Sequence, residues 1–581
     1  MKRIIHSGLA FALAIAAGLA GIGLHAQNSF MVKTSEERQE YNPMIFGAFL
    51  EHFDNQVYGG VFSPGSPLSD EDGFRKDVIE AVKELKVPIV RWPGGCFVSA
   101  YHWKDAVGPN RQAVWDKAWQ VEDPNTFGTD EFIKWCRKVG CEPFICTNAG
   151  TGTMEEMSDW VEYCNQTKGK FARQRAENGH PEPYNVKYWS IGNENWGRHE
   201  LGEKSIDEWC PLVTESAKLM LSADKDINLF AAATPNRDWT YPLLRKAGYL
   251  LDFVSIHGYW VWHDMSKDPN TYLQCMMRTD NPETEISKTI SILDEAGYGD
   301  RIKIAFDEWN LRGWYHPGIA ELKKGYDYAA RRENDFAYTY TMADAIFSAC
   351  FLNTCLRHSD YVDIACISPI TNTRGPIFVH PNGIVRRTHF YTMKMYSNDL
   401  LPYVVPTANI VEDLWNGDSS TEVLDILLTS DKEGKKYVCS VSNKHPEKAV
   451  PLTLDFKGMG IKDPKKVSAR ILSGNSALDY NDMKIMADLY AQTNVQVNWE
   501  NVSESVYSPQ KNLIFGNRAN RPDAIYHAGM GAGEIIKYAK RKVLVPISDY
   551  LDYMPNFRKL LEERPDIKAQ LLNVEDGKIY S

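Results

Sequence analysis

Short apolar runs alternate with amphipathic stretches over the first two thirds of the chain. Between Met44 and Arg386, eight runs rich in β-branched and aromatic residues predict buried strands. These runs are Met44–Phe53, Val87–Gly95, Glu142–Gly150, Val186–Asn195, Ile227–Ala233, Phe253–Trp260, Lys303–Asn310 and Asp363–Thr371. The stretches between them repeat apolar residues at steps of three and four, which predicts helices. The helices are Gly73–Leu85, Thr129–Val139, Ile206–Ala223, Thr284–Ala296 and Asp335–Leu356.

Eight strand–helix units of this length predict an α/β fold, a closed (β/α)8 TIM barrel. A doubly wound open sheet is the alternative. It would be supported by a glycine-rich dinucleotide loop after the first strand, and the sequence has none there.

After Arg386 the pattern changes to alternating segments separated by turn residues, which predicts antiparallel strands. These segments are Glu422–Ser430, Lys436–Asn443, Ala449–Phe456 and Lys466–Leu472. Ser29–Glu40 also has a strand pattern, and we expect it to join the same sheets from the other end of the chain. The prediction is an accessory β-sandwich of the jelly-roll kind.

The last hundred residues have a mixed α/β pattern that does not continue a sandwich. They contain the segment Met483–Gln492, a strand-like segment at Val495–Glu500, and helices near Gly533–Lys540 and Phe557–Glu563. We therefore expect a separate, partial α/β segment at this end.

The N-terminus predicts export. Lys2 and Arg3 precede an apolar run from Leu9 to Leu24, and Ala26 provides a small residue for cleavage. This is typical of a signal peptide and predicts a secreted or periplasmic protein without stable membrane insertion after cleavage. An uncleaved membrane anchor is the alternative, but the run is short for a membrane span.

Composition excludes several classes of protein. Of the 581 residues, 43% are hydrophobic and the net charge is −11, as in a globular protein. No block rich in lysine and arginine appears, so we expect no nucleic-acid partner. The 11 cysteines are odd in number and match no zinc spacing, which favours buried thiols over a disulfide framework.

Two carboxylates stand at the ends of predicted strands, where (β/α)8 barrels carry their reacting groups. Glu194 ends the fourth strand, within the segment Gly-Asn-Glu-Asn, and Glu308 ends the seventh, within Asp-Glu-Trp-Asn. The fourth and seventh strands face each other across a barrel mouth, so this pair can straddle a sugar. Retaining glycosidases use two carboxyl groups about 5–5.5 Å apart, one as acid and one as nucleophile. We expect burial and the neighbouring carboxylate to raise the pKa of the acid.

Other residues at the predicted rim suit this chemistry. Arg91 can keep the nucleophile ionised, and Asn193 can bond a ring hydroxyl next to the reacting carbon. Aromatic faces for the sugar are offered by Trp92, Trp196, Tyr259 and Trp309.

The remaining polar residues have structural interpretations. Asp307 is adjacent to Glu308 and should point to the opposite side of the strand, as a structural partner. His52, His257 and His263 lack the spacing of a metal site, so we expect hydrogen-bonded histidines and no metal.

Several motifs together resemble glycoside hydrolase family 51, and they occur in order along about Ser29–Asp482. Besides the two glutamate motifs they are Gly47–Phe53, Arg91–Phe97, Tyr101–Asp105 and Asn372–Pro381. The resemblance implies a barrel plus a β-sandwich and an α-L-arabinofuranosidase that removes terminal arabinofuranosyl groups with retention. It implies arabinan, arabinoxylan or their oligosaccharides as substrates, a possible homo-oligomer, and no metal or cofactor.

The resemblance also assigns residues. It implies Glu194 as acid/base and Glu308 as nucleophile. The substrate-binding residues that we expect are Glu51, Arg91, Cys96, Trp103, Asn193, His257, Tyr259 and Asn372.

The C-terminal segment resembles the first lobe of extracellular solute-binding proteins of sugar transporters. The segments that carry this likeness lie between Asp523 and Ser581. The likeness begins near Met483, where the sandwich is expected to lack its last strands. We therefore expect a fusion, either natural or from sequence assembly. The expected organisation is signal peptide 1–26, sandwich strand 27–43, barrel 44–386, truncated sandwich 387–482 and partial segment 483–581.

Two rival functions remain open at this point. One is a related retaining barrel glycosidase that acts on β-glucans or xylosides. The other is a catalytically impaired carbohydrate-binding protein, which the presence of both Glu194 and Glu308 argues against.

Overall fold

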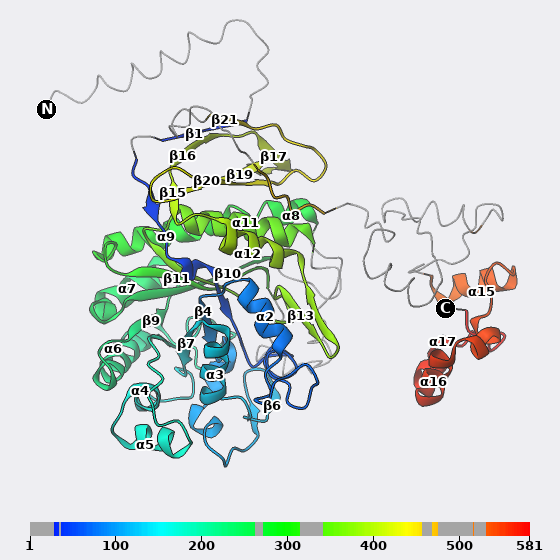
Figure 1. Cartoon of the computed structure of the whole chain (residues 1–581), viewed down its shortest axis with the longest axis horizontal. Helices are drawn as coiled ribbons and strands as arrows, with labels where there is room; N and C mark the ends of the chain where they lie inside the picture. Colours follow the sequence, from blue (N-terminus) through cyan, green and yellow to red (C-terminus); the bar gives the residue numbers. More distant parts are fainter. Residues whose placement is uncertain are drawn as a thin grey trace, which may run out of the picture. The chain divides into compact units, whose positions relative to one another are not determined.

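The computed structural model describes residues 28–33, 36–261, 271–313, 341–455, 468–474, 515 and 530–580 (Figure 1). The chain forms two compact units, Met1–Leu472 and Ser473–Ser581. The predicted signal peptide, His263 and the strand-like segment Val495–Glu500 lie outside the described residues. None of the helices in the described ranges combines the length and the hydropathy required to cross a bilayer.

Eight parallel strands close into a barrel, which confirms the predicted fold class. Each strand lies within one of the eight predicted runs, apart from one or two residues at the C-terminal ends of β10 and β11 and one residue at the start of β12. Around the barrel they are β3 (Gly47–Phe49), β4 (Ile89–Trp92), β7 (Glu142–Thr147), β8 (Tyr188–Ile191), β9 (Asn228–Ala232), β10 (Phe253–Val261), β11 (Lys303–Arg312) and β12 (Val362–Ile367). All four residues of β4 are buried, as expected where helices cover one face of a sheet and the barrel core covers the other.

Helices surround the barrel, and two of them have the predicted bounds. They are α2 (Lys76–Glu84), α3 (Thr129–Val139), α4 (Met154–Asn165), α5 (Lys170–Glu177), α6 (Ile206–Ala223), α7 (Arg237–Ala247), α8 (Tyr272–Met276), α9 (Asn281–Ala296), α11 (Met342–Arg357) and α12 (Thr388–Asp399). The start of α6 is fixed by a capping box between Ser205 and Glu208.

The helix α12 was not predicted, because its sequence follows residue 386, where we expected sandwich strands to begin. It packs on α11, and the Thr392 hydroxyl donates to the carbonyl oxygen of Ala345 at 3.0 Å. The barrel layer of helices therefore continues past the expected boundary.

Short one-turn helices and hairpins complete the loops of the barrel. They are η1 (Pro43–Phe46), η2 (Cys96–Ala100), η3 (Trp103–Ala106), η4 (Gly248–Leu250), the hairpin β5 (Val114–Asp116) with β6 (Val121–Asp123), and the hairpin β13 (Ile377–His380) with β14 (Gly383–Arg386).

Two sheets form beside the barrel helices, and the N-terminal segment contributes a strand to each. One sheet has the order β16 (Thr407–Ile410), β1 (Ser29–Val32), β21 (Thr453–Asp455). The other has the order β2 (Gln39–Glu40), β15 (Tyr403–Val405), β19 (Leu424–Ser430), β20 (Tyr437–Asn443), and β17 (Asp413–Asn416) pairs with β18 (Ser419–Glu422). The expectation that Ser29–Glu40 joins these sheets is confirmed.

The predicted strand Lys466–Leu472 is wrong in the part that the structure describes. Residues 468–474 are irregular and largely exposed. A strand pattern without neighbouring strands or a buried face lacks the packing that stabilises a strand.

The second unit contains α15 (Ala532–Lys540), η10 (Ile547–Tyr553), α16 (Pro555–Glu563) and α17 (Pro565–Leu571). The two helices predicted in this part of the chain correspond to α15 and α16. Most of the described side chains here are exposed, with Tyr538, Leu561 and Ile579 among the buried ones.

Candidate active site

Glu194 and Glu308 lie toward the carboxyl-terminal end of the barrel, where Glu194 follows β8 and Glu308 lies in the second half of β11. Three atoms lie within 4.8 Å of one another: one carboxylate oxygen of Glu194, one carboxylate oxygen of Glu308 and one ring nitrogen of His257. Nδ1 of His257 lies 2.7 Å from Glu194 Oε1 and 3.6 Å from Glu308 Oε1. The separation of the carboxylates fits the short spacing of retaining glycosidases, since inverting enzymes need about 6.5–9.5 Å for a water molecule.

A bulge in β11 gives Glu308 its position. Ser255 of β10 pairs with Ala305 of β11, and the next pair is His257 with Glu308. The step is two residues in β10 and three in β11, so β11 carries one extra residue. The strict alternation of side chains is lost at this point.

The prediction that Asp307 points away from the site is therefore wrong. Its carboxylate accepts a hydrogen bond from Ser255 Oγ at 2.6 Å and lies 3.0 Å from Nε of Arg91, which also holds Glu308. Its predicted role as a structural partner agrees with these contacts, because Asp307 orients Arg91 from inside the barrel.

Glu308 is held by two donors. Arg91 Nη1 donates to Oε1 at 2.6 Å and the Tyr259 hydroxyl donates to Oε2 at 2.8 Å. Ser368 Oγ lies 2.8 Å from the same hydroxyl and can donate to it. The other terminal nitrogen of Arg91 donates to Asn193 Oδ1 at 2.8 Å, so one buried guanidinium aligns both carboxylate-bearing segments.

Glu194 follows β8 in a tight turn. Its φ is +44° and that of Gly192 is +70°, so the loop passes through the left-handed region just before and at the glutamate. Its carboxylate accepts from His199 Nε2 at 2.5 Å and from His257 Nδ1 at 2.7 Å.

The expectation that the pKa of Glu194 is raised is wrong for this structure. Burial raises the pKa, but the hydrogen bonds from His199 and His257 outweigh burial and lower it. Burial alone would lower the pKa values of the His199 and His257 imidazoles. The neighbouring carboxylates nevertheless raise the pKa of His199 to about 9 and that of His257 to about 10. The proton that an acid must deliver thus lies on the histidines, within hydrogen-bond distance of Glu194.

His199 was missed in the sequence. Its only signal is its place five residues after Glu194, just beyond the predicted fourth strand. A histidine in a loop carries no periodicity, so the contact depends on how that loop folds back.

Glu51 lies beside the pair, in the loop after β3. Its Oε1 accepts from the backbone N–H groups of Gly95 and Phe97 and from Trp119 Nε1, each at 3.0 Å. Burial and the charge of Glu308 raise the pKa of Glu51 to about 8. A Cβ on Gly95 would lie 3.0 Å from Glu308 Oε1 and 3.5 Å from Glu51 Oε1, so glycine permits the close approach of both carboxylates.

Cys96 and Glu200 lie on the Glu194 side of the site. Cys96 Sγ, His199 and one oxygen from each of Glu194 and Glu200 lie within 4.8 Å of one another. Glu200 Oε2 accepts from Asn193 Nδ2 at 3.1 Å. Glu200 was also missed in the sequence, where it is one acidic residue in a polar loop.

Two predicted binding residues, Trp103 and Asn372, make contacts with the protein itself. Trp103 Nε1 donates to the carbonyl oxygen of Glu156 at 3.1 Å, and its ring stacks on Trp160. Asn372 accepts from the backbone N–H of Val379 at 2.7 Å and donates to the carbonyl oxygen of Asn55. The contacts described for these side chains do not join them to Glu194 or Glu308.

The other sequence expectations concern histidine and cysteine. His52 Nδ1 lies 2.7 Å from Asp123 Oδ2, and Trp92 Nε1 donates to His52 Nε2 at 3.0 Å, as expected for a hydrogen-bonded histidine. All 11 cysteines are described and free, and all except Cys439 are buried. The prediction of buried thiols is confirmed.

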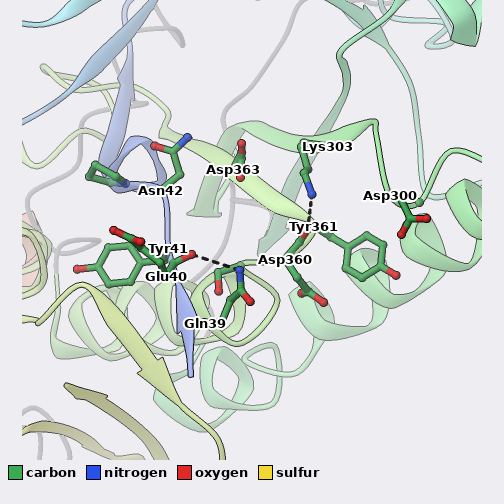
Figure 2. A pocket seen from close by; sticks show the side chains of 12 residues that line it. Gln39, Glu40, Tyr41, Asn42, Asp300, Lys303, Asp360, Tyr361 and Asp363 are labelled. Atoms are coloured by element: carbon green, nitrogen blue, oxygen red, sulfur yellow. Dashed lines mark hydrogen bonds between the residues drawn. The ribbon is translucent and has the colours of Figure 1, made fainter. Parts of the chain in front are cut away.

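A cavity of about 620 Å³ opens at the opposite end of the barrel. Lys303 and Asp363 belong to the starts of β11 and β12, and Gln39 and Glu40 come from β2 (Figure 2). Lys303 Nζ donates to the carbonyl oxygen of Asp360 at 2.6 Å. Because barrel enzymes react at the carboxyl ends of their strands, this cavity is not the place for the chemistry of Glu194 and Glu308.

Two family models match the chain. The model of the α-L-arabinofuranosidase 1 domain matches residues 81–278, and that of the α-L-arabinofuranosidase C-terminal domain matches residues 307–508. The second match extends beyond the predicted end of the likeness near Asp482.

Known proteins show the same relationship. The chain is 36% identical to α-L-arabinofuranosidase C of Emericella nidulans, over 71% of this chain and 84% of that protein. It is 33% identical to an intracellular exo-α-(1→5)-L-arabinofuranosidase of Acetivibrio thermocellus, over 77% and 89% of the two chains.

A solved structure extends the likeness to the fold. A family 51 α-L-arabinofuranosidase from Bifidobacterium longum is 29% identical, with a TM-score of 0.67, over 74% of this chain and 87% of that one. Sequence, fold and the paired carboxylates agree, and this chain belongs to the α-L-arabinofuranosidases of glycoside hydrolase family 51.

Proposed function

We propose that this enzyme releases terminal arabinofuranosyl groups by double displacement, with Glu308 as nucleophile and Glu194 as acid/base. The observation that carries the assignment is the short distance between the two carboxylates, within 4.8 Å, with His257 against both. In the first step Glu308 bonds to the anomeric carbon, the bond to the leaving oxygen breaks, and Glu194 gives that oxygen a proton. In the second step Glu194 takes a proton from water, whose oxygen replaces Glu308.

The partners of Glu308 support its role as nucleophile. Arg91 and Tyr259 donate to its two oxygens and stabilise its negative charge before attack. A guanidinium keeps its protons throughout the physiological pH range, so Arg91 holds Glu308 as a carboxylate without supplying an acid.

The partners of Glu194 support its role as acid/base. Two imidazoles with raised pKa values donate to its oxygens, so a proton can pass along either hydrogen bond as the leaving oxygen becomes basic. The same bonds return the proton in the second step. The acid is then a group of Glu194, His199 and His257 rather than a carboxylic acid alone.

The substrate class follows from the relatives. We infer arabinan, arabinoxylan or their oligosaccharides, cleaved from the non-reducing end, since one relative is named as an exo-α-(1→5)-L-arabinofuranosidase. Glu51, Asn193, Tyr259 and Cys96 surround the two carboxylates, and we assign them to the arabinose hydroxyls.

Export also belongs to the proposal. The charged and apolar N-terminus supports cleavage after Ala26 and a secreted or periplasmic enzyme, although the Acetivibrio relative is named as intracellular. N-terminal sequencing of the protein from the culture medium or periplasm tests this: the mature chain should begin at Gln27.

The activity is tested with aryl glycosides. We expect the purified enzyme to hydrolyse an aryl α-L-arabinofuranoside and to release arabinose from linear arabinan, with little action on the matching xyloside and glucoside. Preference for the xyloside or glucoside would support the rival glycosidase specificity, and binding without hydrolysis would support the impaired binding protein.

A further inference from the structure

Four potential metal ligands meet beside the reacting carboxylates. They come from η2 and from the loop after β8, and they are Cys96, Glu194, His199 and Glu200. We propose that this cluster binds one thiophilic divalent cation, for which Zn²⁺ is the best fit, and that the bound ion inhibits the enzyme.

The donor set matches zinc chemistry. Zinc takes thiolate, imidazole and carboxylate ligands at about 2.0–2.3 Å, which places the ligand atoms of a tetrahedron about 3.3–3.8 Å apart. In this structure the four atoms already lie within 4.8 Å of one another. Small rotations of the side chains are enough to close the site.

Glu200 gives a second, independent reason. Its side chain is buried, its Oε2 accepts from Asn193, and its Oε1 has no hydrogen-bond partner among the described residues. Cys96 and Ser99 face this carboxyl group closely enough to act on its pKa, but neither donates to Oε1 with ordinary geometry. A buried carboxylate oxygen without a donor is costly, and a cation would satisfy it.

The charge of the pocket favours a dication. Four carboxyl groups, those of Glu51, Glu194, Glu200 and Glu308, surround the site. Three of these carboxyl groups, those of Glu51, Glu200 and Glu308, are buried, and a dication offsets part of their combined negative charge. On binding, the thiol proton of Cys96 and the proton that His199 shares with Glu194 leave to solvent, so that sulfur and Nε2 can coordinate. Metal binding at this site therefore releases protons.

A second trio, Glu194, His257 and Glu308, also has ligand atoms within 4.8 Å of one another. It shares Glu194 but contains no sulfur, so a thiophilic ion favours the cluster with Cys96. Mg²⁺ and Ca²⁺ prefer oxygen ligands and octahedral or larger coordination, so neither should compete well.

Inhibition rests on the proposed function, because a metal on Glu194 prevents it from delivering a proton. Binding itself does not rest on that function. The two parts can therefore be tested separately, with spectroscopy for the site and hydrolysis for its effect.

The test uses Co²⁺ as a spectroscopic probe and Zn²⁺ as competitor on the full chain. We expect one Co²⁺ per chain, with a thiolate-to-cobalt charge-transfer band that Zn²⁺ removes and Mg²⁺ does not. Cys96→Ser should lose that band. Both Cys96→Ser and His199→Gln should bind Zn²⁺ at least about tenfold more weakly, because even the loss of a residue that only orients a metal ligand weakens metal binding by this factor. Cys439→Ser, at the cysteine of the sandwich strand β20, is the matched control and should bind as the parent does.

The outcomes separate the site from the reaction. Equal Zn²⁺ affinity in the parent, Cys96→Ser and His199→Gln would overturn the site, as would an equal loss in Cys439→Ser. If the site binds but saturating Zn²⁺ leaves hydrolysis of an aryl arabinofuranoside unchanged, the inhibitory part is wrong. A chain that hydrolyses no arabinofuranoside without metal would overturn the proposed function while the cobalt spectrum still decides the site.

Discussion

Glu194 shows how two partners can reverse the effect of burial on a carboxyl group. Burial and a nearby carboxylate both favour the protonated acid, which is the usual route to a general acid at neutral pH. Here His199 and His257 donate to both oxygens and lower the pKa of Glu194 instead. The proton is retained by the group as a whole, on imidazoles whose pKa values are raised.

This arrangement predicts the alkaline limb of the pH profile. A raised histidine pKa means that the proton is present at neutral pH and is lost as the pH rises through about 9, the value for His199. Replacement of His199 by Gln leaves His257, whose pKa is raised to about 10, as the remaining imidazole donor to Glu194, so the alkaline limb of kcat/KM should move to higher pH. The limb is measured with an aryl arabinofuranoside between neutral and alkaline pH.

His102 provides the matched control for this variant. It also bonds a carboxylate, with Nδ1 at 3.0 Å from Glu156 Oε1, and its pKa is also raised, but its bonds are to a different part of the barrel rim. His102→Gln should leave the limb in place. A limb that is the same in His199→Gln and in the parent enzyme would show that His199 does not supply the proton.

At the scale of elements, the loop after β4 and the bulge in β11 bring the carboxylates together. The loop passes close to Glu308 and Glu51 at Gly95, where a side chain would meet Glu308. The bulge turns Asp307 and Glu308 toward Arg91 at the same time. Precise placement of reacting groups therefore depends on two irregular segments held by regular strands.

Gly95→Ala tests this dependence. The new Cβ would lie 3.0 Å from Glu308 Oε1, so the carboxylate must shift, and we expect kcat/KM to fall by about 10- to 100-fold, as for small misplacements of reacting groups. Gly533→Ala in α15, where an added Cβ would meet nothing within 4 Å among the described residues, should leave kcat/KM unchanged. An unaltered rate in Gly95→Ala would mean that the loop does not set the position of Glu308.

The sequence predicts the regular elements well and the irregular ones poorly. Apolar runs locate all eight barrel strands, because strands buried on both faces leave a strong composition signal. The ends of β8 and β11 then indicate Glu194 and Glu308. The direction of Asp307 depends on one inserted residue, and the contact of His199 depends on a loop, and neither leaves a periodic pattern.

At the scale of the whole molecule, the barrel and the sandwich of the first unit are joined by polar contacts of a buried carboxylate. Asp425 on β19 accepts from Asn353 Nδ2 and Arg357 Nη1 of α11, both at 2.9 Å. The N-terminal strands β1 and β2 lie in the sandwich sheets, and the chain continues from them directly into the barrel. The two parts should therefore unfold together.

Asp425→Ala should lower the free energy of unfolding by about 1–3 kcal/mol, because it leaves the buried amide of Asn353 without its acceptor and Arg357 without its ion pair. Urea unfolding measures the loss, and kcat/KM at low temperature should stay the same. Asp226→Ala is the control, since Asp226 pairs with Lys225 at an exposed position and should change stability by less than about 0.5 kcal/mol. Equal stability of the two variants would contradict a structural role for the Asp425 contacts.

The central claim is the division of roles between Glu194 and Glu308, and azide tests it most directly. Both Glu194→Ala and Glu308→Ala should lose activity on an aryl α-L-arabinofuranoside by orders of magnitude, and azide should restore part of it. In Glu194→Ala the glycosyl-enzyme still forms on Glu308, so NMR should show an arabinofuranosyl azide of retained α configuration. An azide of inverted configuration from Glu194→Ala, or one of retained configuration from Glu308→Ala, would contradict the assignment.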